Sequence, residues 1–152
     1  MKIYFAAAIR GGREDRQLYQ KLISFLKMNK HQQVLTEHIG SSQLISTRES
    51  KLSDKEIRDR DIDLLTQADL VIAETSQPSL GVGYELAQAE QQAKPVIILH
   101  RPGKSTLSAM INGTDYFKDK VHQYETLEDA KRVLNSELEL VAKQIKNASE
   151  EK

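Results

Sequence analysis

Two acidic residues, Glu85 and Asp61, stand in sequence settings that could support nucleophilic or acid–base chemistry. Glu85 follows the loop of residues 77–83, whose proline and two glycines lead into a predicted helix, so it falls in or near the first helical turn. The helix dipole favours a charged carboxylate there and should lower its pKa, which would keep Glu85 ionised and available as a nucleophile. A first-turn acid that does no more than complement the dipole is also common, and this interpretation stays open.

Asp61 interrupts the apolar face of a second predicted helix. Ile57, Leu64 (or Leu65) and Ala68 share that face at helical spacing. A carboxyl group on a buried face has a raised pKa unless it is paired, which suits a general acid or a shared proton. The alternative is a salt bridge or a cap to a neighbouring loop. Two carboxylates with opposite protonation states are typical of glycosidic-bond enzymes, although spacing alone does not show that these two meet.

Residues 9–15, with the sequence Ile-Arg-Gly-Gly-Arg-Glu-Asp, form a candidate anion site. Gly11 and Gly12 allow the backbone to approach a ligand closely, and the helix that follows favours an anion at its start. Arg10 and Arg13 add planar guanidinium groups suited to phosphate. A tight turn from strand to helix with solvated arginines explains the same residues, so both interpretations stay open.

The elements that must position these groups alternate along the chain. Buried apolar runs predict strands at residues 3–9, 33–36, 70–74, 96–100 and 121–124, and helical periodicity predicts helices at 14–28, 53–67, 82–92 and 126–145. This order predicts an α/β fold, a flavodoxin-like (Rossmann-like) parallel five-stranded sheet with helices on both faces. Ligands of such sheets bind outside the carboxyl ends of the strands. We expect one domain over residues 1–146 and a frayed polar tail at 147–152.

The composition narrows the function classes. The 152 residues include 22 Lys+Arg and 22 Asp+Glu, so the net charge of zero lacks the footprint of a nucleic-acid-binding protein. The apolar runs are too short to cross a membrane. The absence of cysteine excludes disulfides and cysteine-ligated metals and, without a leader sequence, fits a cytoplasmic location, although it is also compatible with export. The four histidines lack metal-ligand spacing, so we expect no metal site.

The chain resembles the 2′-deoxynucleoside 5′-phosphate N-hydrolases, a branch of the nucleoside 2-deoxyribosyltransferase superfamily. The resemblance covers about residues 2–113, and its most specific block is residues 75–86, Thr-Ser-Gln-Pro-Ser-Leu-Gly-Val-Gly-Tyr-Glu-Leu. Further matches lie at residues 9–15, 34–38, 101–102 and 107–111. The resemblance implies hydrolysis of the N-glycosidic bond of (2′-deoxy)nucleoside 5′-monophosphates to free base and (deoxy)ribose 5-phosphate, through a covalent glycosyl-Glu85 intermediate and without a cofactor.

The resemblance also implies roles for individual residues. Glu85 matches the nucleophile that attacks C1′, Asp61 the acid that assists departure of the base, and Tyr4 a tyrosine near the nucleophile. The implied 5′-phosphate site consists of Ala7, Ala8, Ile9, Arg10, Gly11, Gly12, Arg13 and Ser79. The positions implied to line the base and sugar are His38, Ile57 and Gly81. Ser108 and Met110 match residues lent to the neighbouring subunit's site, which implies a homodimer.

Two positions depart from the family pattern. Ala8 stands where the hydrolases typically carry a serine that contacts phosphate, and losing a hydrogen bond to a charged group costs about 1.5–3 kcal/mol. His100 replaces a more usual apolar residue before Arg101, and a structural role is the simplest expectation.

Other activities remain open at this stage. A nucleoside 2-deoxyribosyltransferase would exchange bases between deoxynucleosides, and Ala8 is compatible with it. Ser108 argues against it, because transferases typically carry an amide-bearing residue there to bind the 5′-hydroxyl group. A non-catalytic nucleotide-binding sensor would have no need of Glu85, Asp61 and Tyr4 together. A receiver module would need an acidic cluster at the first strand, and a flavodoxin would need a Ser/Thr-rich loop after it. This sequence has neither feature there.

Overall fold

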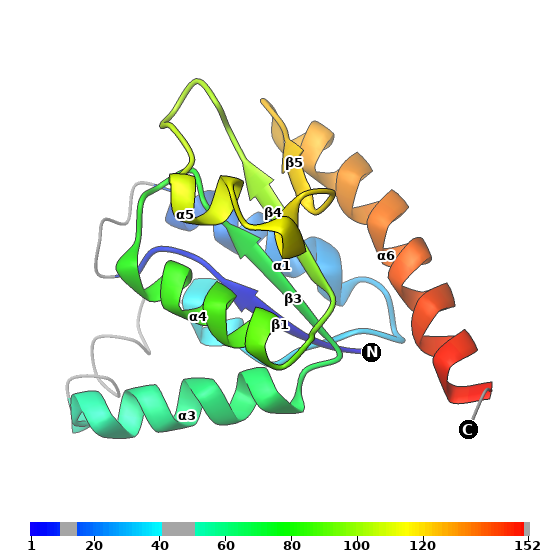
Figure 1. Cartoon of the computed structure of the whole chain (residues 1–152), viewed down its shortest axis with the longest axis horizontal. Helices are drawn as coiled ribbons and strands as arrows, with labels where there is room; N and C mark the ends of the chain where they lie inside the picture. The colour runs from blue at the N-terminus through cyan, green and yellow to red at the C-terminus, as the bar shows by residue number, and fades with distance from the viewer. Residues whose placement is uncertain (10–14, 41–50, 151–152) are drawn as a thin grey trace.

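A computed structural model describes residues 1–9, 15–40 and 51–150 of the chain (Figure 1). Its centre is an all-parallel, five-stranded sheet in the order β2-β1-β3-β4-β5. The strands are β1 (Lys2–Ala6), β2 (Gln33–Val34), β3 (Leu70–Glu74), β4 (Val96–His100) and β5 (Val121–Gln123). The flavodoxin-like fold class predicted from the sequence is confirmed. The chain passes from β1 to β2 on one side and then crosses to β3 on the other, so β1 and β3 flank the point where the strand order reverses, beside which ligands of such sheets bind.

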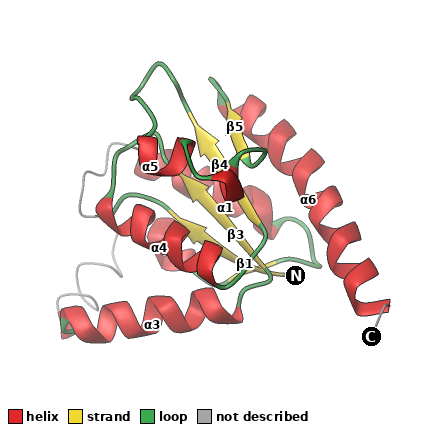
Figure 2. Cartoon of the chain, in the orientation of Figure 1, coloured by secondary structure: helices red, strands yellow, loops and turns green. Residues whose placement is uncertain are grey.

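Helices cover both faces of the sheet (Figure 2). On one face lie α1 (Arg16–Lys27) and α6 (Leu127–Glu150), and on the other lie α3 (Asp54–Gln67) and α4 (Leu80–Gln91). The short elements η1 (Glu37–Gly40), α5 (Ala109–Asn112) and η3 (Asp115–Phe117) occupy the connections. Within the described ranges, every helix is too short or too polar to span a bilayer.

The alternation of side chains along β1 decides which core each residue joins. Ile3 and Phe5 pack with the α1 and α6 layer, whereas Tyr4 and Ala6 pack with the α3 and α4 layer. The register pairs Ile3 with Leu70 on β3. Tyr4 therefore points into the same layer that carries the helices of Asp61 and Glu85.

The strand β2 is shorter than residues 33–36 because a side chain takes over its pairing. The buried Thr36 hydroxyl accepts a hydrogen bond from Phe5 N at 2.8 Å and donates one to Phe5 O at 2.7 Å. These two contacts satisfy the backbone groups of β1 that a longer β2 would have paired. The strand β1 likewise ends at Ala6, so Ala7, Ala8 and Ile9 belong to the following loop.

The start of α3 agrees with the prediction from the sequence, because a capping box marks it. Ser53 and Glu56 form the predicted capping box, with Ser53 N donating to Glu56 Oε2 at 2.7 Å. The predicted frayed tail is wrong over residues 147–150, because α6 continues to Glu150. Ile145 still packs against the core at that end, and Lys146 forms an i,i+4 ion pair with Glu150. Residues 151–152 lie outside the described residues.

Candidate active site

A hydrogen bond between Tyr4 and Glu85 forms the centre of the candidate site. The Tyr4 side chain is buried on β1, and its hydroxyl donates to Glu85 Oε1 at 2.5 Å. The two residues are distant in the chain but meet because β1 and β3 are neighbours and α4 packs on their shared face. The sequence-based pairing of these two residues in one site is thus matched by direct contact.

The predicted pKa of Glu85 is wrong in direction. Burial and the negative charge of Asp61 together raise its pKa to about 7, even though the hydrogen bond from Tyr4 partly offsets them. The helix dipole offers little compensation, because α4 begins at Leu80 and Glu85 therefore lies beyond its first turn.

Tyr4 remains a hydrogen-bond donor at every physiological pH. Burial raises its pKa well above the ordinary tyrosine value, and the charges of Glu85 and Asp61 raise it further. A protonated phenol that donates to a carboxylate orients that carboxylate and stabilises its charged form.

Asp61 lies on α3, partly buried, at the place that the apolar face predicted. Arg60 holds it, with Arg60 Nη2 at 2.8 Å and Nε at 2.9 Å from Asp61 Oδ1. This is the salt bridge that the sequence left open as an alternative. The negative charge of Asp61 nevertheless acts on both Tyr4 and Glu85, so the three groups form one electrostatic cluster.

The candidate phosphate residues are only partly within the described chain. Ala7 and Ala8 are buried at the carboxyl end of β1, and Ile9 is half-buried. The predicted Arg10, Gly11, Gly12 and Arg13 lie outside the described residues. Ser79 is the N-cap of α4, where its hydroxyl accepts a hydrogen bond from Val82 N at 3.3 Å.

Gly81 and Gly83 lie in the first turns of α4 without a packing reason for glycine. A Cβ atom at Gly81 would meet only Ser79 Oγ at 3.7 Å, and one at Gly83 would meet no atom within 4 Å. Glycine weakens a helix relative to alanine. The fold itself therefore does not require a glycine at position 81, beside Ser79.

The remaining predicted residues lie on other elements and differ in how exposed they are to solvent. His38 is half-buried on η1, and Ile57 is half-buried on α3. Ser108 caps α5 by accepting from Met110 N at 3.3 Å, and both residues are exposed. Within one chain, the structure does not record a contact of Ser108 or Met110 with the Tyr4–Glu85 pair among the described residues.

Comparisons with known proteins show the family to which this chain is related. A family model described as nucleoside 2-deoxyribosyltransferase matches residues 3–137. A 5-hydroxymethyl-dUMP N-hydrolase of Tetraodon nigroviridis is 45% identical over 140 residues, covering 85% of this chain and 96% of that protein. The human 5-hydroxymethyl-dUMP N-hydrolase is 44% identical over 126 residues, covering 81% and 71%. The chain belongs to the nucleoside 2-deoxyribosyltransferase family.

Within this family, the resemblance to the branch of 2′-deoxynucleoside 5′-phosphate N-hydrolases is confirmed. Among solved structures, a CMP N-glycosidase of Clostridium botulinum superposes with a TM-score of 0.63 at 22% identity, covering 89% of this chain and 99% of that one. At that identity the likeness shows a shared fold.

The structure also contains a second polar cluster, which was not predicted from the sequence. Its members are Glu74, Ser76, Arg101, Tyr124 and Asp15. A charged residue ending a fully apolar strand, as Glu74 ends β3, is the signal that could have found it. His100 lies next to this cluster. Its Nδ1 is 3.1 Å from Thr75 Oγ1, and its Nε2 is 2.9 Å from Ser105 O. Across the described ranges, no group of three or more carboxylate or histidine side chains is arranged to hold a metal ion.

Proposed function

We propose that this protein hydrolyses the N-glycosidic bond of 2′-deoxynucleoside 5′-monophosphates through a covalent intermediate on Glu85. Its relatives establish it as an N-glycosidic-bond hydrolase that acts on nucleotides. The observation that supports the covalent step is the Tyr4–Glu85 hydrogen bond beside Asp61. It provides one oriented carboxylate and one further acidic group in the same layer.

In the first step, an oxygen of ionised Glu85 attacks C1′ of the sugar. The bond between C1′ and the base nitrogen breaks, its electron pair goes to the base, and Asp61 supplies a proton to the departing base. In the second step, water attacks C1′, the ester bond to Glu85 breaks, and the proton of water returns to Asp61. Free base and deoxyribose 5-phosphate leave, and both carboxyl groups regain their starting state.

The raised pKa of Glu85 is compatible with this cycle near neutral pH. Because its pKa is about 7, a large share of Glu85 is ionised there. The reactive form is the one in which Glu85 is ionised. The Tyr4 hydroxyl stabilises this form because it donates to the Glu85 carboxylate.

The 5′-phosphate group would bind where the carboxyl end of β1 meets the start of α4. The loop after β1 supplies backbone N–H groups and, in sequence, Arg10 and Arg13. Ser79 supplies a hydroxyl group, and Gly81 leaves room beside it for the substrate. Because Ala8 lacks a hydroxyl group, the backbone and the arginines would carry a larger share of the binding.

A homodimer would complete the site, with Ser108 and Met110 supplied by the partner. In support, Leu80 at the start of α4 is 98% exposed and Met110 is 82% exposed, so a partner surface could bury both of these apolar side chains. Ile111, in contrast, packs against its own core. A two-fold interface would cover Leu80 and Met110 and bring Ser108 to the partner's phosphate pocket.

Two experiments test these proposals. Incubation with a panel of nucleosides and 5′-monophosphates, with and without an acceptor base, should give free base from the monophosphates alone. Base exchange on unphosphorylated nucleosides would instead favour a transferase. Trapping with a slow 2′-fluoro substrate followed by mass spectrometry should place the sugar phosphate on Glu85, and an unlabelled protein during turnover would contradict the covalent step.

For the dimer, mixing a Glu85→Ala chain with a Ser108→Trp chain should restore part of the activity. In a shared-site dimer, some mixed dimers regain one intact site, with the nucleophile from one chain and the lent serine from the other. Mixed dimers that demonstrably form but stay inactive would show that each site is built within one chain.

A further inference from the structure

A second tyrosine–glutamate contact lies on the opposite face of the sheet from Tyr4 and Glu85. Glu74, the last residue of β3, is fully buried and accepts a hydrogen bond from the Tyr124 hydroxyl at 2.8 Å. The backbone N–H of Ser76 also donates to Glu74 Oε1 at 3.2 Å, and so does the Ser76 hydroxyl. Glu74 thus fixes the first residues of the loop that leads from β3 to α4.

Arg101 connects this contact to two further loops. Its backbone N–H donates to Ser76 Oγ at 2.8 Å, and its guanidinium carbon lies 5.6 Å from the centroid of the Tyr124 ring. The same guanidinium pairs with the carboxylate of Asp15, and both side chains are largely buried. Ser105, on the loop after Arg101, donates from its hydroxyl to Ser76 O at 2.7 Å.

Asp15 is the residue whose position is unexpected. It is the N-cap residue of α1, where an aspartate ordinarily accepts hydrogen bonds from the first-turn N–H groups. Asp15 makes no such side-chain contact to the described residues of α1, because its carboxylate pairs with Arg101 at the end of β4. Without Arg101, this carboxylate would lose the ion pair that the described residues give it, and its negative charge would stand at the start of α1.

The three loops joined by this network are the three that carry the proposed phosphate residues. The β1–α1 loop carries residues 7–13, the β3–α4 loop carries Ser79, and the β4–α5 loop carries Ser108. A substrate phosphate carries close to two negative charges near pH 7, so a nearby unpaired carboxylate would repel it strongly.

We propose that Arg101 is a positioning residue for the substrate's 5′-phosphate group. It neutralises Asp15, turns that carboxylate away from the start of α1, and ties the three loops together through Ser76. This inference rests on the proposed function, since it assumes that the phosphate lies at these loops. It assigns Arg101 a role in discrimination between nucleotide and nucleoside, without contact with the substrate.

The test compares Arg101→Met, Asp15→Asn and the double variant, with deoxynucleoside 5′-monophosphate and the matching nucleoside as substrates. Arg101→Met should raise KM for the nucleotide about tenfold or more through charge repulsion, with a smaller change in kcat. Binding of deoxyribose 5-phosphate, measured by calorimetry, should weaken in parallel. The double variant should recover most of the loss, because Asp15→Asn removes the exposed charge.

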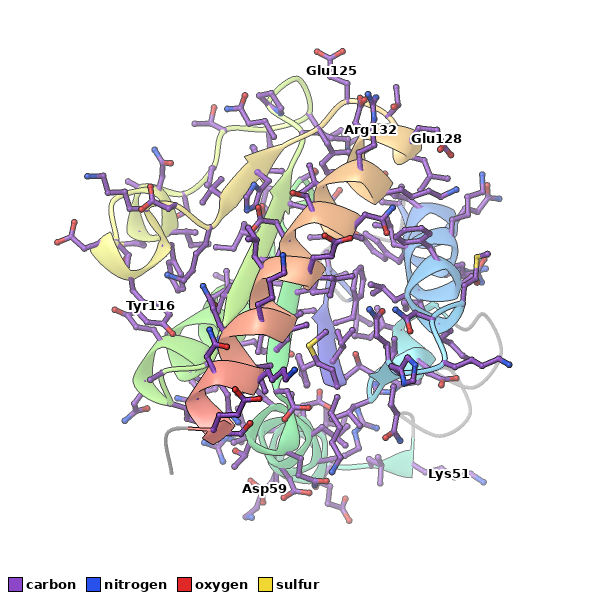
Figure 3. The ribbon with its side chains drawn as sticks, turned by 90° about the vertical axis from the view of Figure 1, so that its right-hand side faces the viewer. Lys51, Asp59, Tyr116, Glu125, Glu128 and Arg132 are labelled. Atoms are coloured by element: carbon purple, nitrogen blue, oxygen red, sulfur yellow. The ribbon has the colours of Figure 1, made fainter. Side chains whose placement is uncertain are left out.

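Matched variants separate this role from a purely structural one. Arg132→Met removes a comparable ion pair, with Asp129, at an exposed position near the start of α6, and should change neither constant (Figure 3). Arg101→Lys keeps the charge and should retain most of the preference for the nucleotide. Asp15→Asn alone should leave the nucleotide KM at or below the wild-type value, and this variant stays informative if Arg101→Met does not fold.

Two results would overturn the inference. One is an Arg101→Met variant that folds and loses nucleotide and nucleoside turnover equally, and the other is a double variant that is no better than Arg101→Met. A wild-type protein that binds deoxyribose 5-phosphate but releases no base would contradict the proposed function alone. A wild-type protein that does not bind deoxyribose 5-phosphate would contradict the phosphate site and this inference together.

Discussion

The two tyrosine–glutamate contacts at the carboxyl edge of the sheet differ in how completely the carboxylate is satisfied. Glu74, on the α1 and α6 face, is fully buried and accepts from Tyr124 and from both the backbone and side chain of Ser76. Glu85, on the α3 and α4 face, is only partly buried, and within the described residues it accepts one hydrogen bond, from Tyr4.

We propose that this difference separates a positioning carboxylate, Glu74, from a reactive one, Glu85. Burial raises the pKa of both groups. Several donors hold Glu74 in one place and use its lone pairs, so it is not available to a substrate. Glu85 accepts fewer hydrogen bonds within the described residues, and its pKa of about 7 leaves a large share of it ionised near neutral pH.

The largest expected effect is the loss of turnover in Glu85→Gln. The amide cannot attack C1′, so base release from a deoxynucleoside monophosphate should fall about a thousandfold or more, as for other catalytic side chains that act as a unit. Chromatography of the free base measures the rate, and circular dichroism checks the fold. Near-wild-type release by this variant would remove the distinction between the two glutamates.

The pH dependence should follow the ionisation of Glu85. As pH rises through about 7, kcat/KM should increase, because a larger share of Glu85 is then ionised and able to attack C1′. An ordinary base needs a proton in order to leave, whereas a base activated by electron-withdrawing groups needs less protonation. Asp61→Asn should slow the ordinary base strongly and the activated base less. Equal losses for both bases would count against the acid role.

Replacing Tyr124 and replacing Tyr4 should have different effects on stability and on turnover. Tyr124→Phe removes a donor to the fully buried Glu74 and should lower the free energy of unfolding by about 1–3 kcal/mol. Tyr4→Phe should lower stability less, because Glu85 is partly buried, but should reduce turnover more. Urea unfolding and kcat measured on the same preparations test this, and the reverse order of effects would overturn the comparison.

Replacing Glu85 should also change the pH dependence of stability. Its pKa of about 7 in the folded state exceeds the value near 4.5 of an unperturbed glutamate, so the folded protein binds a proton that the unfolded chain releases between these values. Wild-type stability should therefore decrease as pH rises from about 4.5 to 7. Glu85→Gln removes this dependence and should be more stable than wild type at pH 8 by about 1–3 kcal/mol. Parallel stability curves for the two proteins from pH 5 to pH 8 would show that Glu85 is not desolvated.

The smallest expected effect comes from Gly81→Ala. A methyl group fits there without a clash, so the variant should gain about 0.5–1 kcal/mol of stability from its higher helix propensity. Because the added methyl would occupy space beside Ser79, KM for the nucleotide should rise. A variant that is more stable and unchanged in KM would show that the substrate does not approach α4 at this point.

The sequence determined the fold class and nominated members of the candidate site. Periodicity and the alternation of strands and helices predicted the parallel sheet, and the Ser53–Glu56 capping box predicted the start of α3. These signals depend on residues that are neighbours in the sequence, so they can be recognised before the fold is known. The motif of residues 75–86 likewise made Glu85 a candidate, and the apolar face of α3 made Asp61 one.

Only the tertiary structure decided the protonation of Glu85 and the use of Asp15. The pKa of Glu85 is raised because the elements packed around it shield it in part from water, and no local pattern encodes that desolvation. Asp15 would cap α1 by local rules, but Arg101 reaches it from the end of β4. Both outcomes depend on residues far apart in the chain, whose charges and burial act on each other only after the sheet has assembled.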